Sequence, residues 1–301
     1  MKMASRDWAL LVLLSILWGG AFFFAAIAVK ETPPLTLVLC RVGIAAAVLF
    51  AFIKIKGEII PKNTSLLIAC LIMGLFNNLI PFSLLFWAQT SIPSGLASIL
   101  NATTPIFSIV VAHFLLADER MALNRFTGII LGFLGVAVLI GGNAISGTTI
   151  ATLGILACLG AALSYGIAGV YGRRFRTMGV SPSVGAFGQL AATTIMMIPL
   201  VIFIDSPWEL PLPSKAAISS IVALAVASTA LAYLIFFRLL ASAGSVNATL
   251  VTLLIPVSAI VLGTVFLDEI LTQRHYLGMS LILIGLIAVD GRIFQTLKPS
   301  N

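Results

Sequence analysis

The sequence predicts an all-α integral membrane protein of ten transmembrane helices, arranged as two inverted five-helix repeats with both termini in the cytoplasm. Three observations lead to this prediction: the composition, a motif that occurs twice, and the placement of Lys and Arg. Hydrophobic residues make up 60% of the 301 residues and charged residues only 9%, whereas soluble domains carry about 25% charged residues. The composition therefore indicates a membrane protein and excludes a disordered chain.

About 20 apolar residues are needed to cross the hydrocarbon core of a bilayer. Ten segments approach this requirement, and prolines, glycines or short polar stretches separate them: 8–29, 34–53, 65–87, 93–116, 126–142, 153–172, 182–204, 216–237, 244–266 and 276–290. The stretch 205–215 is among the longest connections. We therefore expect a single membrane domain in contact with the lipid bilayer, without a separate nucleotide-binding domain.

A motif of one proline, an acidic pair and two glycines occurs in each half of the chain. It comprises Pro105, Asp118-Glu119, Gly128 and Gly135 in the first half, and Pro256, Asp268-Glu269, Gly278 and Gly285 in the second. Each half holds five predicted spans, an odd number, so the two halves enter the membrane with opposite orientation. Inverted repeats of this kind are typical of alternating-access carriers. We assign the first repeat to residues 1–146 and the second to residues 147–301.

The basic residues test this topology, because cytoplasmic loops of membrane proteins are enriched in Lys and Arg. With the amino terminus inside, thirteen of the seventeen Lys and Arg residues fall in cytoplasmic segments. Three fall outside, namely Lys30, Lys215 and Arg274, and Arg41 lies within a span. The net charge of +7 is thus interpreted as a topology signal, and we expect no nucleic-acid partner.

Aligning the repeats pairs polar and aromatic residues at matching depths. The pairs are Trp18 with Tyr165, Arg41 with Gln189, Asn77-Asn78 with Ser228-Thr229, Phe82 with Tyr233, and Asn101 with Thr252. Polar groups within a membrane tend to face a bundle interior or a wet cavity. We therefore predict a central cavity built mainly from spans 1, 3, 4, 6, 8 and 9, with the substrate-binding residues Trp18, Asn78, Asn101, Tyr165, Gln189 and Tyr233. Aromatic rings would supply stacking contacts, and the amides would bind amino or carboxylate groups.

Several of these residues also have a purely structural interpretation. Asn78 and Asn101 could join helices by hydrogen bonds, and Trp18 could belong to an interfacial belt. Arg41, about seven residues into span 2, could extend outward to solvent or pair with a neighbouring helix, or it could contact a substrate carboxylate.

Two further features concern helix geometry. Pro105 and Pro256 occupy equivalent helices, where they could act as gating hinges or cause structural bends. The glycines of the motif favour close helix packing, either within the protein or across a dimer. We expect a monomer or a weak homodimer.

The sequence lacks the patterns of several other mechanisms. It has no phosphate-binding loop of the ATPase type and no constellation typical of a catalytic or metal site, so we expect no enzymatic activity, cofactor or metal. No Asp or Glu lies centrally in a predicted span, which favours gradient-driven transport over tight ion coupling. Aromatic and amide residues suit a neutral or zwitterionic solute.

The chain resembles the drug/metabolite transporter superfamily, and within it the EamA type, over residues 8–292. The matching features are Leu17-Trp18-Gly19, Pro33-Pro34 before a span containing Arg41, and the two proline, acidic-pair and glycine motifs. The resemblance implies ten helices and export of small metabolites by alternating access. Within the superfamily the chain looks like bacterial inner-membrane exporters of aromatic and other neutral amino acids. It departs from many relatives at Tyr165, where they carry Trp, and its halves differ at Arg41 and Gln189.

Two alternatives remain at this level. The chain could carry another small metabolite or drug, although a carrier of cationic drugs would be expected to hold a carboxylate at mid-membrane. It could also be a membrane scaffold that transports nothing, but such a protein would not need polar residues at matched depths in both halves.

Overall fold

A computed structural model describes residues 4–61, 63–116, 123–140, 150–248 and 250–290. Within these ranges the regular secondary structure is entirely helical. Within the described residues, each of the ten predicted segments contains at least one helix. Seven helices in the described part of the chain are long and apolar enough to cross a membrane, and the apolar helices at 126–139 and 251–266 are shorter.

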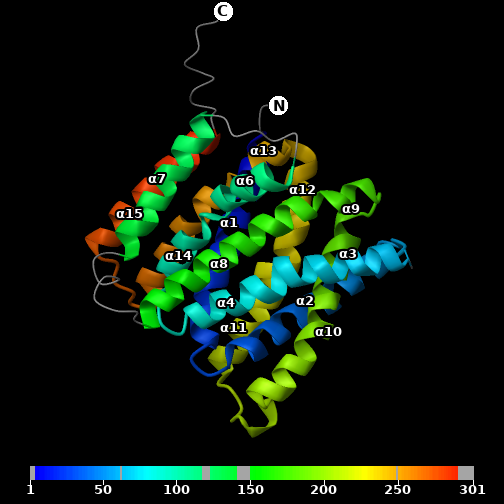
Figure 1. Cartoon of the computed structure of the whole chain (residues 1–301). Coiled ribbons are helices and arrows are strands. Elements are labelled where there is room, and N and C mark those ends of the chain that lie inside the picture. The colour runs from blue at the N-terminus through cyan, green and yellow to red at the C-terminus, as the bar shows by residue number, and fades with distance from the viewer. Residues whose placement is uncertain (1–3, 62, 117–122, 141–149, 249, 291–301) are drawn as a thin grey trace, which may run out of the picture.

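The first half contains five helical segments, two of which are interrupted (Figure 1). Segments 3 and 4 are each built from more than one element. In chain order the elements are α1 (Ser5–Ala28), α2 (Pro34–Ile55), α3 (Thr64–Gly74) with the π-helix η1 (Leu75–Leu79) and α4 (Ile80–Ala88), α5 (Ser94–Asn101) with α6 (Thr104–Leu115), and α7 (Leu123–Ile140).

The second half repeats this plan with additional short elements. They are α8 (Ile150–Tyr171), α9 (Arg173–Thr177), α10 (Pro182–Leu200) with the π-helix η3 (Val201–Asp205), the 3₁₀-helix η4 (Pro207–Glu209), α11 (Lys215–Ala225) with the π-helix η5 (Val226–Leu231) and α12 (Ala232–Ala243), α13 (Ser245–Ala248), α14 (Val251–Phe266) and α15 (Gln273–Asp290). The side chains of Asn63, Ser181 and Ser214 accept hydrogen bonds from backbone N–H groups in the first turns of α3, α10 and α11, which satisfies donors that a helix start leaves free.

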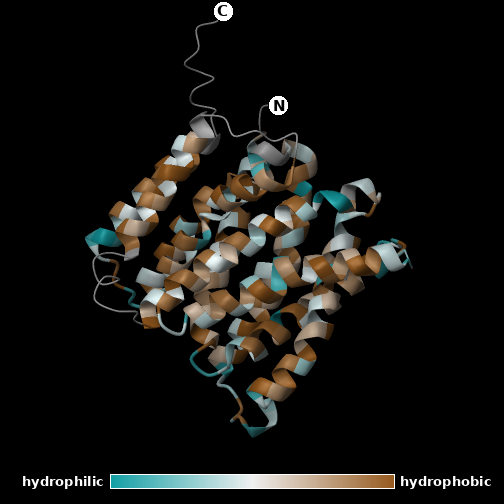
Figure 2. Ribbon diagram, in the orientation of Figure 1, coloured by the Kyte–Doolittle hydropathy of each residue, from teal (hydrophilic) through white to brown (hydrophobic). Residues whose placement is uncertain are grey.

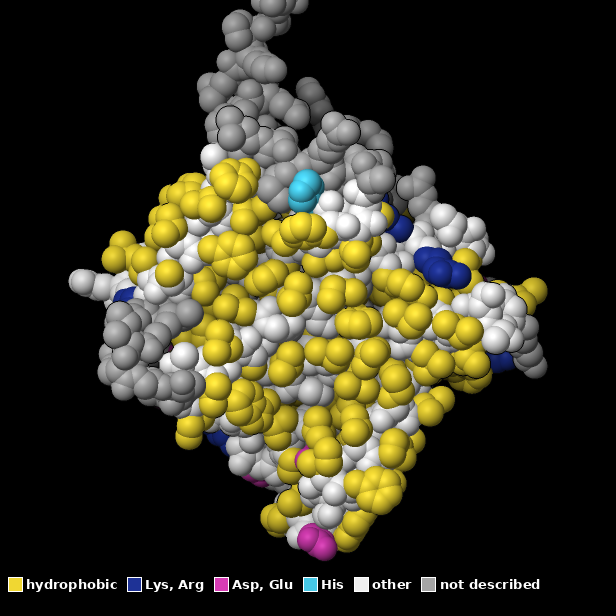
Figure 3. Space-filling view, viewed as in Figure 1, with side chains coloured by type: hydrophobic (Ala, Val, Ile, Leu, Met, Phe, Trp, Pro, Cys, Tyr) yellow, Lys and Arg dark blue, Asp and Glu magenta, His cyan; other side chains and the backbone are white. Residues whose placement is uncertain are grey.

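The surface matches a membrane environment. Hydrophobic residues lie along nearly every helix in Figure 2. In Figure 3 hydrophobic side chains cover the middle of the visible face, and the charged side chains that can be seen lie toward its edges. Large exposed side chains such as Phe126 on α7 and Ile195 on α10 are suited to contact with lipid acyl chains.

Helices α7 and α15 lie side by side (Figure 1) and are locked together by the repeated glycines. A Cβ atom on Gly135 would lie 2.7 Å from the Gly278 carbonyl oxygen, and a Cβ atom on Gly285 would lie 2.6 Å from the Gly128 carbonyl oxygen. The two backbones therefore touch, and the glycine motif joins two helices of the same chain.

The π-helices η1 and η5 occupy matching positions of the two halves. They contain the aligned pairs Asn77-Asn78 and Ser228-Thr229. A π-helical turn widens the helix and frees backbone carbonyl groups, and such turns occur frequently at functional sites. In η1 and just before it, the carbonyls of Gly74 and Phe76 accept hydrogen bonds from Thr193 and Ser164, so the widened turn is fastened to the second half.

Candidate functional site

A cavity of about 690 Å³ lies between the two halves, within the size range of small-molecule sites. Residues of the predicted spans 1, 3, 4, 6, 8 and 9 line it, together with one residue each from α2 and α15. The prediction of which spans surround the cavity is therefore confirmed. Tyr165 of α8 packs against both main hydrophobic clusters of the core, which places the cavity between them.

Aromatic rings form much of the cavity wall. The rings of Trp18 and Phe236 are 5.4 Å apart, and those of Phe82 and Tyr165 are 6.5 Å apart in an edge-to-face arrangement. Such spacings are typical of favourable aromatic pairs. The aromatic lining residues are Trp18, Phe22, Phe82, Phe86, Tyr165, Tyr233 and Phe236. An apolar or aromatic group of a ligand would find stacking surfaces on several sides.

The polar lining is mostly neutral. It includes Asn77, Gln89, Asn101, Ser228 and Thr229, and none of the described lining residues is Asp or Glu. Asn101 ends α5, immediately before the break that separates α5 from α6. The Asn101 Oδ1 and Ser228 Oγ atoms are buried without a hydrogen-bond partner in the described structure. Buried polar atoms are normally satisfied, so these two atoms are candidates for ligand contact.

The structure places four of the six predicted binding residues on the cavity wall: Trp18, Asn101, Tyr165 and Tyr233. Asn78 and Gln189 lie behind it, with 0% and 6% of their surface exposed. Asn77 faces the cavity instead of Asn78, since neighbouring residues of a helix point about 100° apart. Its Nδ2 donates to the Gln189 Oε1 at 2.9 Å. Asn78 and Gln189 thus support the wall from the second layer.

Arg41 lines the cavity, contrary to one expectation from sequence. Only 7% of its surface is exposed, so the prediction that its side chain extends outward to solvent is wrong. Its Nε donates to the Thr229 hydroxyl at 2.9 Å, and that hydroxyl donates to the Leu224 carbonyl at 2.8 Å. The guanidinium carbon lies 3.8 Å from the Phe82 ring centroid and 5.6 Å from that of Phe86. Both distances are within the range of cation–π contacts.

The two prolines differ in their setting. Pro105 lies in the first turn of α6 and on the cavity wall. Backbone N–H groups in the first turn have no partner within the helix, so a proline there removes no helical hydrogen bond. Pro256 lies inside α14 and is buried. The break near the first proline therefore has no counterpart at the same position of the second half. A hinge role for either proline stays a prediction.

The acidic pairs can be compared only in part. Asp118-Glu119 lies outside the described residues. In the second pair, Glu269 accepts hydrogen bonds from the backbone N–H groups of Ser94 and Gly95 at 2.7 and 3.0 Å. A carboxylate at a helix N-terminus is favourable because of the free N–H groups there. The second acidic pair thus fastens the end of α14 to the start of α5 in the other half.

Buried side chains close one end of the cavity. Phe22, Phe86 and Gln89 expose 8% of their surface or less, and Gln89 Nε2 donates to the Phe22 carbonyl at 2.8 Å. At the other end, toward the end of α8, Gly169 is exposed and Gly172 is partly exposed.

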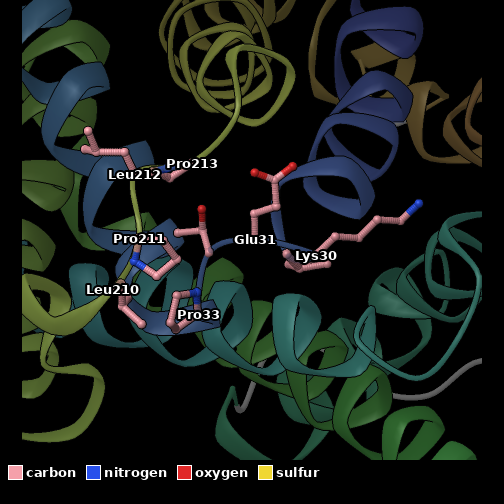
Figure 4. Close-up of a pocket in the computed structure, with 9 residues that line it drawn as sticks. Lys30, Glu31, Pro33, Leu210, Pro211, Leu212 and Pro213 are labelled. Carbon is pink, nitrogen blue, oxygen red and sulfur yellow. The ribbon is translucent and has the colours of Figure 1, made fainter.

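A second hollow of about 480 Å³ lies between one loop of each half, formed by residues 29–33 and 210–213 (Figure 4). Glu31 accepts hydrogen bonds from the Ser214 backbone N–H and hydroxyl at 2.6 and 2.7 Å, and these bonds lower the pKa of the Glu31 carboxyl. Lys30 extends away from Leu212 and Pro213 (Figure 4). Because prolines and a paired carboxylate dominate this hollow, we interpret it as a loop contact and the central cavity as the candidate site.

Comparison with known proteins agrees with this architecture. The sequence model of the EamA-like transporter family matches residues 7–141 and, a second time, residues 152–289. The chain belongs to this family of membrane transporters. The expected membership of the drug/metabolite transporter superfamily is thereby confirmed.

Individual relatives cover nearly the whole chain. An Escherichia coli (strain K12) protein described as "Uncharacterized inner membrane transporter YedA" is 28% identical over 288 residues, covering 95% of this chain and 91% of the relative. A "Probable amino-acid metabolite efflux pump" of the same organism is 28% identical over 295 residues, covering 94% of each. A solved crystal structure with 22% identity matches with a TM-score of 0.66 over 98% of this chain and 100% of its own. It supports the fold alone.

Proposed function

We propose that this transporter exports amino acids, aromatic and other neutral ones, across the bacterial inner membrane. Transport would proceed by alternating access through the central cavity and would be driven by the substrate gradient. The similarity to relatives described as an inner membrane transporter and as a probable amino-acid metabolite efflux pump supports the location and the cargo.

The composition of the cavity wall carries this proposal. Seven aromatic residues would receive an apolar side chain, whereas neutral amides, hydroxyls and Arg41 offer hydrogen bonds to a polar end. Small-molecule sites typically combine an apolar wall with a few polar groups that fix orientation. Trp18 and Tyr165 would supply the stacking contacts, and Asn101, Asn77 and Tyr233 the polar ones, with Asn78 and Gln189 holding them in place.

The proposed topology has ten spans and both termini in the cytoplasm. The bias of Lys and Arg toward the segments assigned to that side supports it. In this orientation the end of the cavity closed by Phe22, Phe86 and Gln89 faces outward, and Glu269 helps to close it by holding α5. Opening would require movement of α5 and α6, for which the break before Pro105 and the bend at Pro256 would serve as hinges.

Counterflow into proteoliposomes tests the proposal directly. Purified protein would be reconstituted with unlabelled phenylalanine inside, and uptake of labelled phenylalanine, leucine and glutamate would be measured with and without a pH gradient. We expect uptake of the neutral amino acids above that of protein-free liposomes, and little effect of the pH gradient. The absence of counterflow for every amino acid would overturn the proposed cargo.

A further inference from the structure

Arg41 is the one charged side chain among the described residues that line the cavity. It is also buried, with 7% of its surface exposed. The other titratable side chains on the described part of the wall are the phenols of Tyr165 and Tyr233, and none of the described lining residues carries a carboxylate. A buried cation without an anion is costly.

The guanidinium is held in a defined orientation. Its Nε donates a hydrogen bond to the Thr229 hydroxyl in η5, and that hydroxyl donates to the Leu224 carbonyl in α11. One face of the guanidinium lies against the Phe82 ring. The bond to Thr229 is the one hydrogen bond of Arg41 to the described residues. The two terminal nitrogens therefore keep four N–H donors without an acceptor among the described residues. Adjacent donors of a guanidinium match the two oxygens of a carboxylate.

We propose that Arg41 binds the carboxylate of the transported molecule, and that the cargo is therefore a small molecule with one carboxylate and an apolar body. This inference rests on the proposed transport through the central cavity. One cation in a wall that is otherwise neutral matches one negative charge, whereas a phosphate ester or a dicarboxylate would leave charge unpaired. Amines that lack a carboxylate would meet the uncompensated charge of Arg41 and no acidic partner.

Binding to the unmodified protein provides the first test. Thermal unfolding of the purified protein in detergent would be measured with phenylalanine, with phenylalanine amide and with phenylpropionate, which lacks the amino group. Stabilisation by both carboxylates, and at least about tenfold weaker stabilisation by the amide, would support the proposal. Equal stabilisation by phenylalanine and its amide, or by none of the three, would overturn it.

Variants of Arg41 provide the second test. In counterflow, Arg41→Gln should lower uptake of the carboxylate substrate by about 10- to 100-fold. Arg41→Lys keeps the positive charge but loses the paired N–H donors of the guanidinium, so its uptake should lie between that of the wild type and that of Arg41→Gln. Arg238→Gln, which makes the same substitution at an exposed position of α12 outside the cavity lining, is the matched control and should keep the preference for carboxylate over amide. Unchanged preference in Arg41→Gln would contradict the role of Arg41.

The two proposals fail in different ways. If the wild type carries phenylpropionate and not amino acids, and Arg41→Gln loses that transport, the amino-acid cargo is wrong and the carboxylate role stands. If the wild type carries amino acids and Arg41→Gln carries them equally well, the cargo is right and the carboxylate role is wrong. If Arg41→Gln does not fold, the comparison of acid with amide on the wild type decides the question.

Discussion

Arg41 with Thr229 and Gln189 with Asn77 are the same contact made twice, once in each orientation. In both, a residue about two turns into the second helix of one half reaches a π-helical turn in the third helix of the other half. Arg41 Nε donates to Thr229 Oγ1 at 2.9 Å, and Gln189 Oε1 accepts from Asn77 Nδ2 at 2.9 Å. The backbone plan is therefore repeated, whereas the chemistry is not, because only the first contact carries a charge, and because Arg41 lines the cavity whereas Gln189 does not.

The difference indicates how an inverted repeat can bind an asymmetric molecule. Matched backbones allow the two halves to exchange roles as the cavity opens on either side. Unmatched side chains give the cavity a charged side and a neutral side, so a substrate with one carboxylate has one preferred orientation.

The largest expected effect comes from exchanging the two residues in the double variant Arg41→Gln/Gln189→Arg. Gln189 lies behind Asn77 and not on the wall, so an arginine there would not offer its donors to the cavity. We expect counterflow of the carboxylate substrate at about 1–10% of the wild-type rate, as for Arg41→Gln alone, since a hydrogen bond to a charged group contributes about 1.5–3 kcal/mol. Recovery to the wild-type rate would mean that the halves are interchangeable.

Gly19 and Gly166 occupy equivalent positions in the two halves. Substituting them tests whether both halves depend on the same close approach of helices. A Cβ atom on Gly19 would lie 2.9 Å from the Ala259 nitrogen, and one on Gly166 would lie 3.0 Å from the Ser108 nitrogen. Because a backbone atom cannot move aside alone, alanine at either position should lower the free energy of unfolding by about 1–3 kcal/mol. Thermal unfolding in detergent measures the loss.

Neighbouring glycines where a Cβ atom would make only ordinary van der Waals contacts are the controls for this pair. The nearest atom to a Cβ on Gly20 is 3.5 Å away, and to one on Gly169 it is 3.8 Å away. Alanine there should be neutral, or stabilising by up to about 1 kcal/mol from helix propensity. Losses in the controls as large as those at Gly19 and Gly166 would contradict the packing explanation.

The π-helical turns should respond differently to loss of their polar residues. Asn77→Ala would leave the buried Gln189 Oε1 without its donor, which costs about 1–3 kcal/mol of unfolding free energy. Ser228→Ala should have little effect on stability, because the Ser228 hydroxyl has no partner in the described structure. Equal losses in the two variants, measured by thermal unfolding, would show that the turns are equivalent in energy as well as in shape.

The smallest expected effect on stability concerns two carboxylates, that of Glu58 after α2 and that of Asp205 at the end of η3. Glu58 accepts hydrogen bonds from the hydroxyls of Ser183 and Ser181 at the start of α10, and Asp205 accepts from the N–H and hydroxyl of Thr36 at the start of α2. The Ser183 hydrogen bond, assisted by Ser181 and Lys56 and opposed by partial burial, lowers the pKa of Glu58.

A lowered pKa in the folded state gives a stability that depends on pH. The contribution of Glu58 is complete above its unfolded pKa of about 4.3 and is lost as the pH falls through the lowered folded value. Glu58→Gln should cost no more than about 1 kcal/mol at pH 7, and the difference from wild type should shrink as the pH falls below about 4.3. A difference that persists unchanged at low pH would exclude the carboxylate as its source.

Much of the fold follows from the sequence. Hydropathy located the helical segments of the described residues, and the glycine spacing predicted close helix packing, which is seen between α7 and α15. The repeat alignment predicted which spans surround the cavity, and it placed Trp18, Asn101, Tyr165 and Tyr233 on the wall. These features depend on composition and spacing, which a sequence displays directly.

The remaining features depend on contacts between distant segments. The π-helical turns interrupt the helical phase, so alignment could not decide which of Asn77 and Asn78 faces the cavity. The orientation of Arg41 is set by Thr229, 188 residues away, and by the ring of Phe82. A basic residue near a predicted helix end is equally compatible with extension to solvent, and only the tertiary contacts exclude it.

The proposal that the central cavity is the transport site is tested most directly by counterflow of labelled phenylalanine in three variants. Trp18→Ala and Asn101→Ala remove two residues of the wall, and Phe126→Ala removes a ring from α7 that is 50% exposed. We expect both wall variants to be folded in detergent and inactive in proteoliposomes, and Phe126→Ala to transport as the wild type does. Full transport by both Trp18→Ala and Asn101→Ala would contradict the assignment of the site.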